Sequence, residues 1–377
     1  MIDLALLPRS RTRVLHVVQN LNYGGMERLM FDLIRSLDKD EFESHVLVLQ
    51  YVGRFGKDLE EHSAISVAGR MGPLSMLWPA SLAAEMRRIA PDVIHCHSGV
   101  WHKAAAAARL AGVRRVIFTE HGRSYPDPWL ARFFDHLAST RADAVVAVSQ
   151  PVADHLSRRV RVDAHKLHVV PNGVDTTRFA ELADTGVIRS EFNLAHDQPI
   201  IGSVGRLEPV KGFEVMLRAF GLLLQEPPPG PRPVLLIAGD GSARGQLEAL
   251  VRELGLEGSV LLPGWRDDLE HLYGSFSVFS MSSFSEGTSI SLLEAMSAGL
   301  CPVVTDVGGN RQVLGAALHH RLVPSADPVA LARALRDALE RTGARIADGA
   351  VARARATAEY SLRSMVARYE SLYRNED

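Results

Sequence analysis

The chain has 377 residues, of which 46% are hydrophobic and 23% are charged, a composition that predicts two globular domains and excludes a largely disordered protein. Its net charge of -2 excludes the positive field of a typical nucleic-acid-binding protein, so no nucleic-acid partner is expected. Cysteine occurs only at Cys96 and Cys301, which excludes a disulfide framework and favours the reducing cytosol.

The N-terminal segment does not resemble a signal peptide. In residues 1–13 the basic side chains follow the short apolar run, whereas a signal peptide places them before it. No apolar run approaches the roughly 18 residues that span a bilayer. We therefore expect a cytoplasmic protein, either free or attached peripherally at the inner face of the membrane.

Strands and helices alternate through the first half of the chain. Residues 13–18 predict a strand, residues 19–25 a glycine-containing loop and residues 26–37 an amphipathic helix. Further strands, each with its following loop, are expected at 44–49, 91–99, 114–122, 143–149 and 166–175, with helices at 81–90 and 101–112. Apolar strands that alternate with helices are typical of a parallel sheet covered on both faces.

A second alternating series follows the polar stretch 176–199. Its strands and their loops are expected at 199–207, 233–241, 259–265, 277–283 and 301–309, and an amphipathic helix closes the chain at 361–374. We therefore predict an α/β protein with Rossmann-like, doubly wound domains at 1–180 and 181–358, and with residues 359–377 returning to the N-terminal domain. Tandem domains of this kind leave a cleft that the strand carboxyl ends face.

Two glutamates stand eight residues apart in the segment 283–299. Glu286 lies in a polar loop, whereas Glu294 lies inside a predicted helix. One interpretation is structural, because Ser291 followed by Glu294 matches a capping box and Glu286 is then a solvated loop charge. The other is that both carboxylates bind a ligand.

Two cations follow the first strand of the second series. Arg206 and Lys211 lie on one loop, and a guanidinium fork beside an ammonium group suits a pyrophosphate. The alternative is a pair of solvated surface cations.

A glycine pair, Gly24 and Gly25, precedes the first helix. The segment lacks the G-x-G-x-x-G spacing of a dinucleotide-binding turn, which disfavours NAD binding and a dehydrogenase. The two glycines either bring backbone N–H groups close to an anion or form an ordinary strand-to-helix turn.

Three histidines lie close together in the first half of the chain. His95 and His97 alternate across Cys96 and so point to one face of a strand end, with His102 near them in sequence. A zinc site is conceivable, but no complete ligand set can be assigned. We expect these histidines to be polar residues that line the cleft, and we expect no bound metal.

These segments resemble the retaining, nucleotide-sugar-dependent glycosyltransferases of the GT-B architecture, in the E-x7-E group (glycosyltransferase family 4-like, group 1). The matching residues are GG at 24–25, PNGVD at 171–175, GRLEPVKG at 205–212, AGDG at 238–241 and EGTSISLLEAMSAG at 286–299. The resemblance covers nearly the whole chain. It implies the GT-B fold, with an acceptor-side N-terminal domain and a nucleotide-sugar-binding C-terminal domain facing a central cleft.

The resemblance also implies different roles for the two glutamates. Glu286 would hold hydroxyl groups of the transferred sugar, and Glu294 would accept hydrogen bonds from the ribose hydroxyls. The backbone of Gly287, Thr288 and Ser289 would lie beside the sugar and the phosphates. Many relatives have an aromatic residue and a glycine after E-G, so contacts to the sugar are expected to differ here.

His121 is similar to the family position whose imidazole or main chain faces the transferred sugar, although it could also be an ordinary hydrogen-bonding loop histidine. We therefore expect catalytic roles for Arg206, Lys211, Glu286 and His121. Gly24, Gly25, Gly287, Thr288, Ser289 and Glu294 are the expected substrate-binding residues.

The implied reaction is metal-independent transfer of a hexose from a UDP- or GDP-linked donor to a hydroxyl acceptor, with retention at the anomeric carbon and no further cofactor. The acceptor would be a glycan, a lipid-linked sugar or a small molecule, and one setting is cell-surface polysaccharide or glycolipid assembly. The basic run at 158–166 is a candidate for membrane contact, the alternative being a solvated face. A nucleotide-sugar 2-epimerase and a non-catalytic nucleotide-sugar sensor are the alternative functions.

Overall fold

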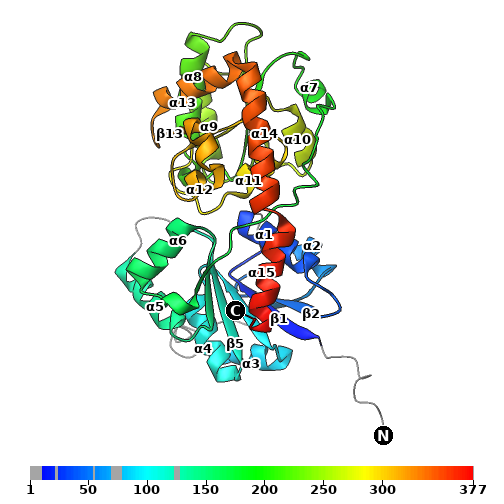
Figure 1. The fold of residues 1–377 in the computed structure, drawn as a ribbon, viewed down its shortest axis with the longest axis vertical. Coiled ribbons are helices and arrows are strands. Elements are labelled where there is room, and N and C mark those ends of the chain that lie inside the picture. The colour runs from blue at the N-terminus through cyan, green and yellow to red at the C-terminus, as the bar shows by residue number, and fades with distance from the viewer. Residues whose placement is uncertain (1–10, 22–23, 54–55, 69–78, 123–127, 377) are drawn as a thin grey trace. The chain divides into compact units, whose positions relative to one another are not determined.

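The computed structural model describes residues 11–376 except 22–23, 54–55, 69–78 and 123–127 (Figure 1). The segment 1–13, for which we predict no signal peptide, therefore lies largely outside the described residues. The chain divides into two compact units: unit 1 comprises residues 1–171 and 365–377, and unit 2 comprises residues 172–364. The sequence placed the corresponding boundaries after residues 180 and 358.

Unit 1 is built on a parallel sheet with the strand order β3-β2-β1-β4-β5-β6-β7. The strands are β1 (Thr12–Val18), β2 (Phe42–Val48), β3 (Ala64–Val67), β4 (Val93–His97), β5 (Arg115–Glu120), β6 (Ala144–Ala147) and β7 (Leu167–Val169). The helices are α1 (Gly25–Ser36), α2 (Gly56–Glu60), α3 (Ala80–Ile89), α4 (Trp101–Ala111), α5 (Trp129–Ser139), α6 (Gln150–His155), the π-helical turn η3 (Leu156–Val160) and the 3₁₀ turn η4 (Ala164–Lys166).

Helices cover both faces of this sheet, as the apolar strands predict. Alternate residues of β1 enter different hydrophobic clusters, with Leu15 packing in the cluster that holds Trp101 of α4 and Val18 in the cluster that holds Met30 of α1. Successive side chains of a strand point to opposite faces, so a strand buried on both faces must be apolar at nearly every position.

Unit 2 repeats the arrangement with the strand order β10-β9-β8-β11-β12-β13, again all parallel. Its strands are β8 (Ile200–Val204), β9 (Val234–Ala238), β10 (Val260–Gly264), β11 (Val278–Met281), β12 (Pro302–Thr305) and β13 (Leu322–Val323). Its helices are α7 (Val187–Glu191), α8 (Phe213–Gln225), α9 (Arg244–Glu253), α10 (Leu269–Ser275), α11 (Ile290–Ser297), α12 (Asn310–Leu314), α13 (Pro328–Glu340) and α14 (Thr342–Glu359), with 3₁₀ turns η5 (Pro209–Lys211) and η6 (Ala316–Arg321). The prediction of two doubly wound, Rossmann-like α/β units is confirmed.

The last helix, α15 (Leu362–Arg374), lies against the sheet of unit 1 (Figure 1), and two of its tyrosines reach residues of that sheet. The Tyr373 hydroxyl lies 2.7 Å from Nδ1 of His95, and the Tyr369 hydroxyl lies 3.2 Å from the Thr119 hydroxyl. The chain thus completes unit 1 with a segment that follows unit 2. Within the described residues, no helix has both the length and the apolar composition that crossing a bilayer requires.

In both sheets the first three strands are added toward one edge, and from the fourth strand on the order reverses toward the other edge. In unit 1 the reversal lies between β1 and β4, and in unit 2 between β8 and β11. Loops that leave the carboxyl ends of the strands at such a point are where open α/β sheets bind ligands. The candidate site residues were therefore sought in these loops.

Candidate functional site

In unit 2, the loops that follow β8, β9, β11 and β12 are joined at the carboxyl edge of the sheet. The Phe284 amide donates to the Val210 carbonyl at 2.8 Å, and the Gly309 amide donates to the Gly287 carbonyl at 3.1 Å. A Cβ on Gly239, where φ is +149°, would overlap the Gly205 carbonyl oxygen. Backbone contacts therefore fix these loops against one another, which pre-positions the side chains that they carry.

Glu286 and Lys211 form an ion pair at the centre of this set of loops. Nζ of Lys211 lies 2.6 Å from Oε1 of Glu286, and the Glu286 side chain is only 8% exposed. The Ser283 hydroxyl donates to the same carboxylate oxygen at 2.6 Å. The loop interpretation that made Glu286 a solvated charge is therefore wrong, since two donors hold a nearly buried carboxylate.

Glycine at position 212 makes the close approach of Lys211 possible. Gly212 has φ +60°, and a Cβ there would overlap the Ser282 carbonyl oxygen. The Ser282 hydroxyl donates to the Gly212 carbonyl at 2.8 Å, so the two loops are joined beside the ion pair. Arg206, on the same loop as Lys211, is exposed. Lys211 is thus held in place, whereas Arg206 extends into solvent.

Glu294 lies in α11 and is buried, at 6% exposure. The Tyr273 hydroxyl of α10 donates to its Oε2 at 2.8 Å, and burial followed by the Glu294 charge raises the Tyr273 pKa well above its ordinary value. The capping-box interpretation is wrong, because the N-cap of α11 is Ser289 and makes no side-chain cap hydrogen bond. A carboxylate held inside a helix by a tyrosine needs another explanation.

The backbone between the two glutamates is fixed by Asn172, at the start of unit 2. Its Nδ2 donates to the Thr288 carbonyl at 2.7 Å, and the Thr288 and Ser289 residues are buried. Asn172 belongs to the PNGVD segment, whose role the sequence did not assign. The hydrogen bond from Asn172 therefore holds the backbone from Gly287 to Ser289 in place where it leads into α11.

Gly308 is a residue whose importance the sequence analysis did not recognise. It follows β12 with φ +53°, and a Cβ there would overlap the backbone oxygen of Glu286. The signal that the sequence offered for this residue was the adjacent pair Gly308 and Gly309, which is typical of a turn. Gly308 supports the loop that carries the buried carboxylate.

We expect Gly308→Ala to lower the free energy of unfolding of unit 2 by about 2–4 kcal/mol, because it adds overpacking to an unfavourable positive φ. The matched control is Gly245→Ala in α9, where a Cβ would meet nothing within 4 Å and should be neutral or stabilise by up to about 1 kcal/mol. Urea unfolding followed by circular dichroism measures both. Equal midpoints for the two variants would contradict the assignment.

In unit 1, Gly24 and His121 follow two different strands of the sheet. Gly24 is the N-cap of α1, with an extended φ of -166°, and Gly25 is the first residue of that helix. The His121 amide follows β5 and donates to the Ser98 hydroxyl at 2.9 Å, and that hydroxyl donates to Glu120 at 2.8 Å. The structure therefore ties His121 to the loop after β4.

His121 is one end of a chain of imidazoles. Its Nε2 lies 3.0 Å from Nδ1 of His97, and Nε2 of His97 lies 3.4 Å from Nδ1 of His16 in β1. The outer nitrogens of this chain, Nδ1 of His121 and Nε2 of His16, are buried and have no hydrogen-bond partner within the described part of the protein. Three neutral imidazoles in such a chain satisfy one another and leave one unsatisfied nitrogen at each end.

His16, His95 and His97 are the group in the described chain whose nitrogens come within 4.8 Å of one another, as metal ligands would. The sequence analysis missed His16 and named His102, which instead contacts the Phe134 ring. Both ring nitrogens of His95 already have partners at 2.7 Å, the hydroxyls of Tyr373 and Thr119. A metal here would have to displace one of these hydrogen bonds.

Acid is expected to destabilise unit 1 through these histidines. Burial lowers the pKa of His121 to about 4, and burial with the nearby Lys39 charge lowers that of His16 to about 3, from 6.5. Each ring is neutral in the folded protein and gains a proton in the unfolded chain below about pH 6.5, so its stabilisation is complete above that pH and is lost toward the folded-state pKa.

The loss should be on the order of 1 kcal/mol per pH unit for each of the two histidines between about pH 6 and pH 4. Calorimetry at a series of pH values should show the unit-1 transition moving to lower temperature across this window. A transition that stays constant between pH 7 and pH 4.5 would show that the buried rings already carry protons.

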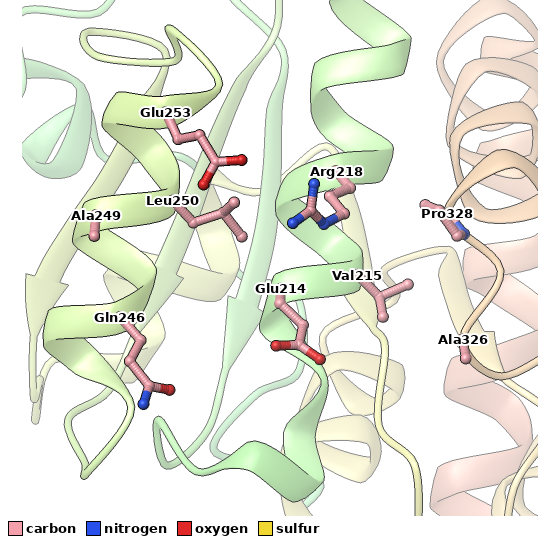
Figure 2. A pocket seen from close by; sticks show the side chains of 9 residues that line it. All are labelled: Glu214, Val215, Arg218, Gln246, Ala249, Leu250, Glu253, Ala326 and Pro328. Carbon is pink, nitrogen blue, oxygen red and sulfur yellow. The ribbon is translucent and has the colours of Figure 1, made fainter.

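A pocket of about 670 Å³ lies elsewhere in unit 2 (Figure 2). Its lining residues lie on α9 (Gln246 and Glu253), on α8 (Glu214 and Arg218) and, beyond α8, at Pro328, the first residue of α13. None of the predicted site residues lines it. The pocket is therefore separate from the loops at the carboxyl edge.

Two family profiles match the chain in succession. "Glycosyltransferase Family 4" matches residues 23–178, and "Glycosyl transferases group 1" matches residues 184–354. These ranges fall almost entirely within unit 1 and unit 2, respectively. Each unit therefore corresponds to one profile.

Individual relatives agree with the profiles. The chain is 32% identical over 286 residues to a D-inositol 3-phosphate glycosyltransferase of Xylanimonas cellulosilytica, covering 70% of this chain and 68% of that protein. It is 28% identical over 230 residues to the UDP-Gal:alpha-D-GlcNAc-diphosphoundecaprenol alpha-1,3-galactosyltransferase of Escherichia coli, covering 58% and 59%. The crystal structure of Anabaena Alr3699/HepE in complex with UDP and glucose superposes with a TM-score of 0.85 at 21% identity, covering 97% of this chain and 100% of that one.

Proposed function

Because the chain belongs to the group 1 glycosyltransferases and has the GT-B fold, we propose that it transfers a hexose from a UDP- or GDP-linked donor to a hydroxyl acceptor, with retention at the anomeric carbon. The observation that carries the proposal is a pair of carboxylates: Glu294 of α11 is buried, and the side chain of Glu286, in the loop before α11, is only 8% exposed. The nucleotide of the donor and the hexose attached to it would bind at these loops of unit 2.

The chemistry of the loops suits a nucleotide sugar. A sugar and a ribose both present hydroxyl donors, for which the carboxylates of Glu286 and Glu294 are strong acceptors. A diphosphate requires cations and backbone N–H groups, which Lys211, Arg206 and the entry to α11 supply. The Lys211 ion pair places a positive charge directly beside the carboxylate that would hold the sugar.

In the proposed reaction, the bond between the anomeric carbon and the diphosphate oxygen breaks while the acceptor oxygen bonds to the same face of that carbon. The acceptor proton passes to the departing diphosphate oxygen. Arg206 and Lys211 stabilise the negative charge that develops there, so catalysis rests on positioning and electrostatics. Neither a metal ion nor a covalent intermediate takes part in this scheme.

His121 would take part in binding the transferred sugar. Its low pKa keeps the imidazole neutral at pH 7, so it would act as a hydrogen-bonding group and not as a cation. The backbone N–H groups at Gly24 and Gly25 would face an anionic part of the donor or acceptor.

The acceptor is proposed to be a lipid-linked sugar at the inner face of the membrane, in cell-surface polysaccharide or glycolipid assembly. The E. coli relative named above acts on a diphosphoundecaprenol-linked sugar, which supports this choice of acceptor class. The protein itself would be cytoplasmic and would meet this acceptor at the inner face of the membrane.

Nucleotide release measured across a panel of UDP- and GDP-sugars, with and without a synthetic lipid-linked acceptor, tests the proposal. We expect release that depends on the acceptor, and an α-linked product from an α-linked donor by NMR. Release without acceptor together with an altered sugar would identify a 2-epimerase. Tight donor binding without any turnover would identify a sensor, and an inverted product would overturn retention.

A further inference from the structure

Three histidines of unit 1 form a continuous hydrogen-bonded chain from β1 to the loop after β5. Nε2 of His121 and Nδ1 of His97 are 3.0 Å apart, and Nε2 of His97 and Nδ1 of His16 are 3.4 Å apart. The ring centres of these two pairs are 5.3 and 5.7 Å apart, with interplanar angles of 24° and 16°. Each pair of nitrogens therefore lies between its two rings, as an in-plane hydrogen bond requires.

The strand order β1-β4-β5 brings the three rings together. His16 of β1 is paired with His95 of β4, and His97 is paired with Thr119 of β5, two residues before His121. His95 and His97 are two residues apart on one strand, so their side chains lie on the same face of the sheet. The chain of rings thus depends on three neighbouring strands and not on spacing within one segment.

The three rings are neutral at pH 7, because burial lowers the pKa of each below the ordinary 6.5. A neutral imidazole carries one N–H and one lone pair, so a ring in the middle of a chain donates on one side and accepts on the other. The chain therefore has two arrangements. Either every N–H points toward His16 and Nδ1 of His121 keeps a lone pair, or every N–H points toward His121 and its Nδ1 carries the proton.

Charged groups near the two ends favour the second arrangement. Burial and then the nearby Lys39 charge lower the pKa of His16 to about 3, which places an ammonium group near that end. At the other end the His121 amide donates to the Ser98 hydroxyl, which donates to the Glu120 carboxylate. A row of N–H groups that points away from a cation and toward an anion is stabilised at both ends. Nδ1 of His121 is thus the nitrogen that carries the proton.

We propose that His97 and His16 are positioning residues, which hold His121 in the tautomer with the proton on Nδ1 and so prepare it to donate a hydrogen bond to an oxygen of the transferred sugar. His16 and His97 are buried, at 0% and 1% exposure, so they act only through His121, which is partly exposed.

The free end of the chain supports a ligand contact. Nδ1 of His121 is buried and has no hydrogen-bond partner among the residues that the structure describes. A buried donor without an acceptor is costly, and a sugar oxygen would supply the acceptor. The inference rests on the proposed function for the identity of this ligand, whereas the link between the tautomers can be measured without any ligand.

NMR of the full chain with ¹⁵N-labelled histidine tests this link. At pH 7, long-range correlation spectra show which ring nitrogen carries the proton, and in the wild type it should be Nδ1 of His121. His97→Leu removes the partner of Nε2, so His121 should shift toward the tautomer with the proton on Nε2. His16→Leu should cause a smaller shift in the same direction, because it acts through one intervening ring and through the longer hydrogen bond.

Two further variants separate positioning from folding. In His97→Asn the side-chain amide can donate to Nε2 of His121 from the place of the lost Nδ1, so the wild-type tautomer should return. His95→Asn is the matched control on the same strand, since His95 is equally buried but bonds to the hydroxyls of Tyr373 and Thr119. It should leave the His121 tautomer unchanged, and urea unfolding shows which variants remain folded.

Turnover should follow the tautomer. For the intact donor, His97→Leu should lower kcat/KM about three- to tenfold, the effect of one neutral hydrogen bond, and His97→Asn should recover most of this loss. The affinity for free UDP or GDP should stay unchanged in both variants, because a free nucleotide has no transferred sugar. A general loss of folding would lower both quantities together.

The outcomes separate this inference from the proposed function. A proton on Nε2 of His121 in the wild type, or the same tautomer in wild type and in folded His97→Leu, would overturn the inference alone. So would one equivalent of zinc that copurifies with the wild type and is lost in His97→Leu, since a metal would then occupy the lone pairs. The expected tautomers in a protein that transfers no sugar from any donor would overturn the proposed function and leave the linked tautomers standing.

Discussion

Replacing Glu294 with glutamine is expected to weaken binding of free UDP or GDP by about 10- to 100-fold, the range for hydrogen bonds to a charged group. The carboxylate is buried and accepts from the Tyr273 hydroxyl at 2.8 Å, and a carboxylate has the capacity to accept from a vicinal diol as well. Glutamine keeps the shape but loses the charge and one acceptor oxygen. Isothermal titration calorimetry with each nucleotide measures the change.

Glu286→Gln is the matched control, since a free nucleoside diphosphate has no transferred sugar for Glu286 to contact. Its affinity for UDP or GDP should stay near that of the wild type, whereas turnover with the intact donor should fall. Tyr273→Phe tests whether the hydroxyl that holds Glu294 matters separately. Wild-type nucleotide affinity in Glu294→Gln would end the ribose assignment, and wild-type turnover in Glu286→Gln would end the sugar assignment.

Arg206→Ala and Lys211→Ala are each expected to lower kcat by about 100- to 1000-fold, the effect of removing one charge-stabilising group from a preorganised site. Their effects on stability should differ. Arg206 is exposed, so its removal should leave the free energy of unfolding unchanged, whereas removing Lys211 leaves the 8%-exposed Glu286 carboxylate without its cation. Steady-state kinetics and urea unfolding of both variants measure the two effects separately.

A double-mutant cycle with Lys211→Ala and Glu286→Gln tests whether the pair acts as a unit. Nζ of Lys211 and Oε1 of Glu286 are 2.6 Å apart, so we expect the losses in the free energy of unfolding to be strongly non-additive. The neutral glutamine should recover part of the stability that Lys211→Ala removes. Catalysis should not recover with it, because the diphosphate would still lack the ammonium group. Additive stability effects, or wild-type turnover by the soluble Lys211→Ala protein, would contradict this role.

The ion pair also bears on how the site is organised before a donor arrives. Lys211 neutralises Glu286 and is held there by the joined loops at Gly212 and Ser282. A preorganised charge needs little rearrangement when negative charge develops nearby, which is the condition for electrostatic stabilisation. Exposed Arg206 lacks this restraint, so ordering of its side chain would accompany donor binding.

The sequence by itself determined the architecture of each unit. Apolar strands that alternate with helices can satisfy their backbone and bury both sheet faces only as a covered parallel sheet, so the fold class followed from local patterns. The GG, GRLEPVKG and EGTSISLLEAMSAG segments also placed the candidate residues in loops at the carboxyl ends of strands. The structure confirms the doubly wound fold and places these segments in loops at the carboxyl ends of β1, β8 and β11 and in the helices that follow, with Glu294 inside α11.

Only the tertiary structure decided which side chains meet. Lys211 is 75 residues from Glu286, Tyr273 holds Glu294 from another helix, and His16 joins the histidines of β4 because β1 and β4 are neighbours in the sheet. The capping box failed for the same reason, since local spacing favoured it while burial against α10 gave Glu294 a different partner. Periodicity reports which face of its own element a residue occupies, whereas contacts between elements depend on strand order and register, which no local spacing encodes.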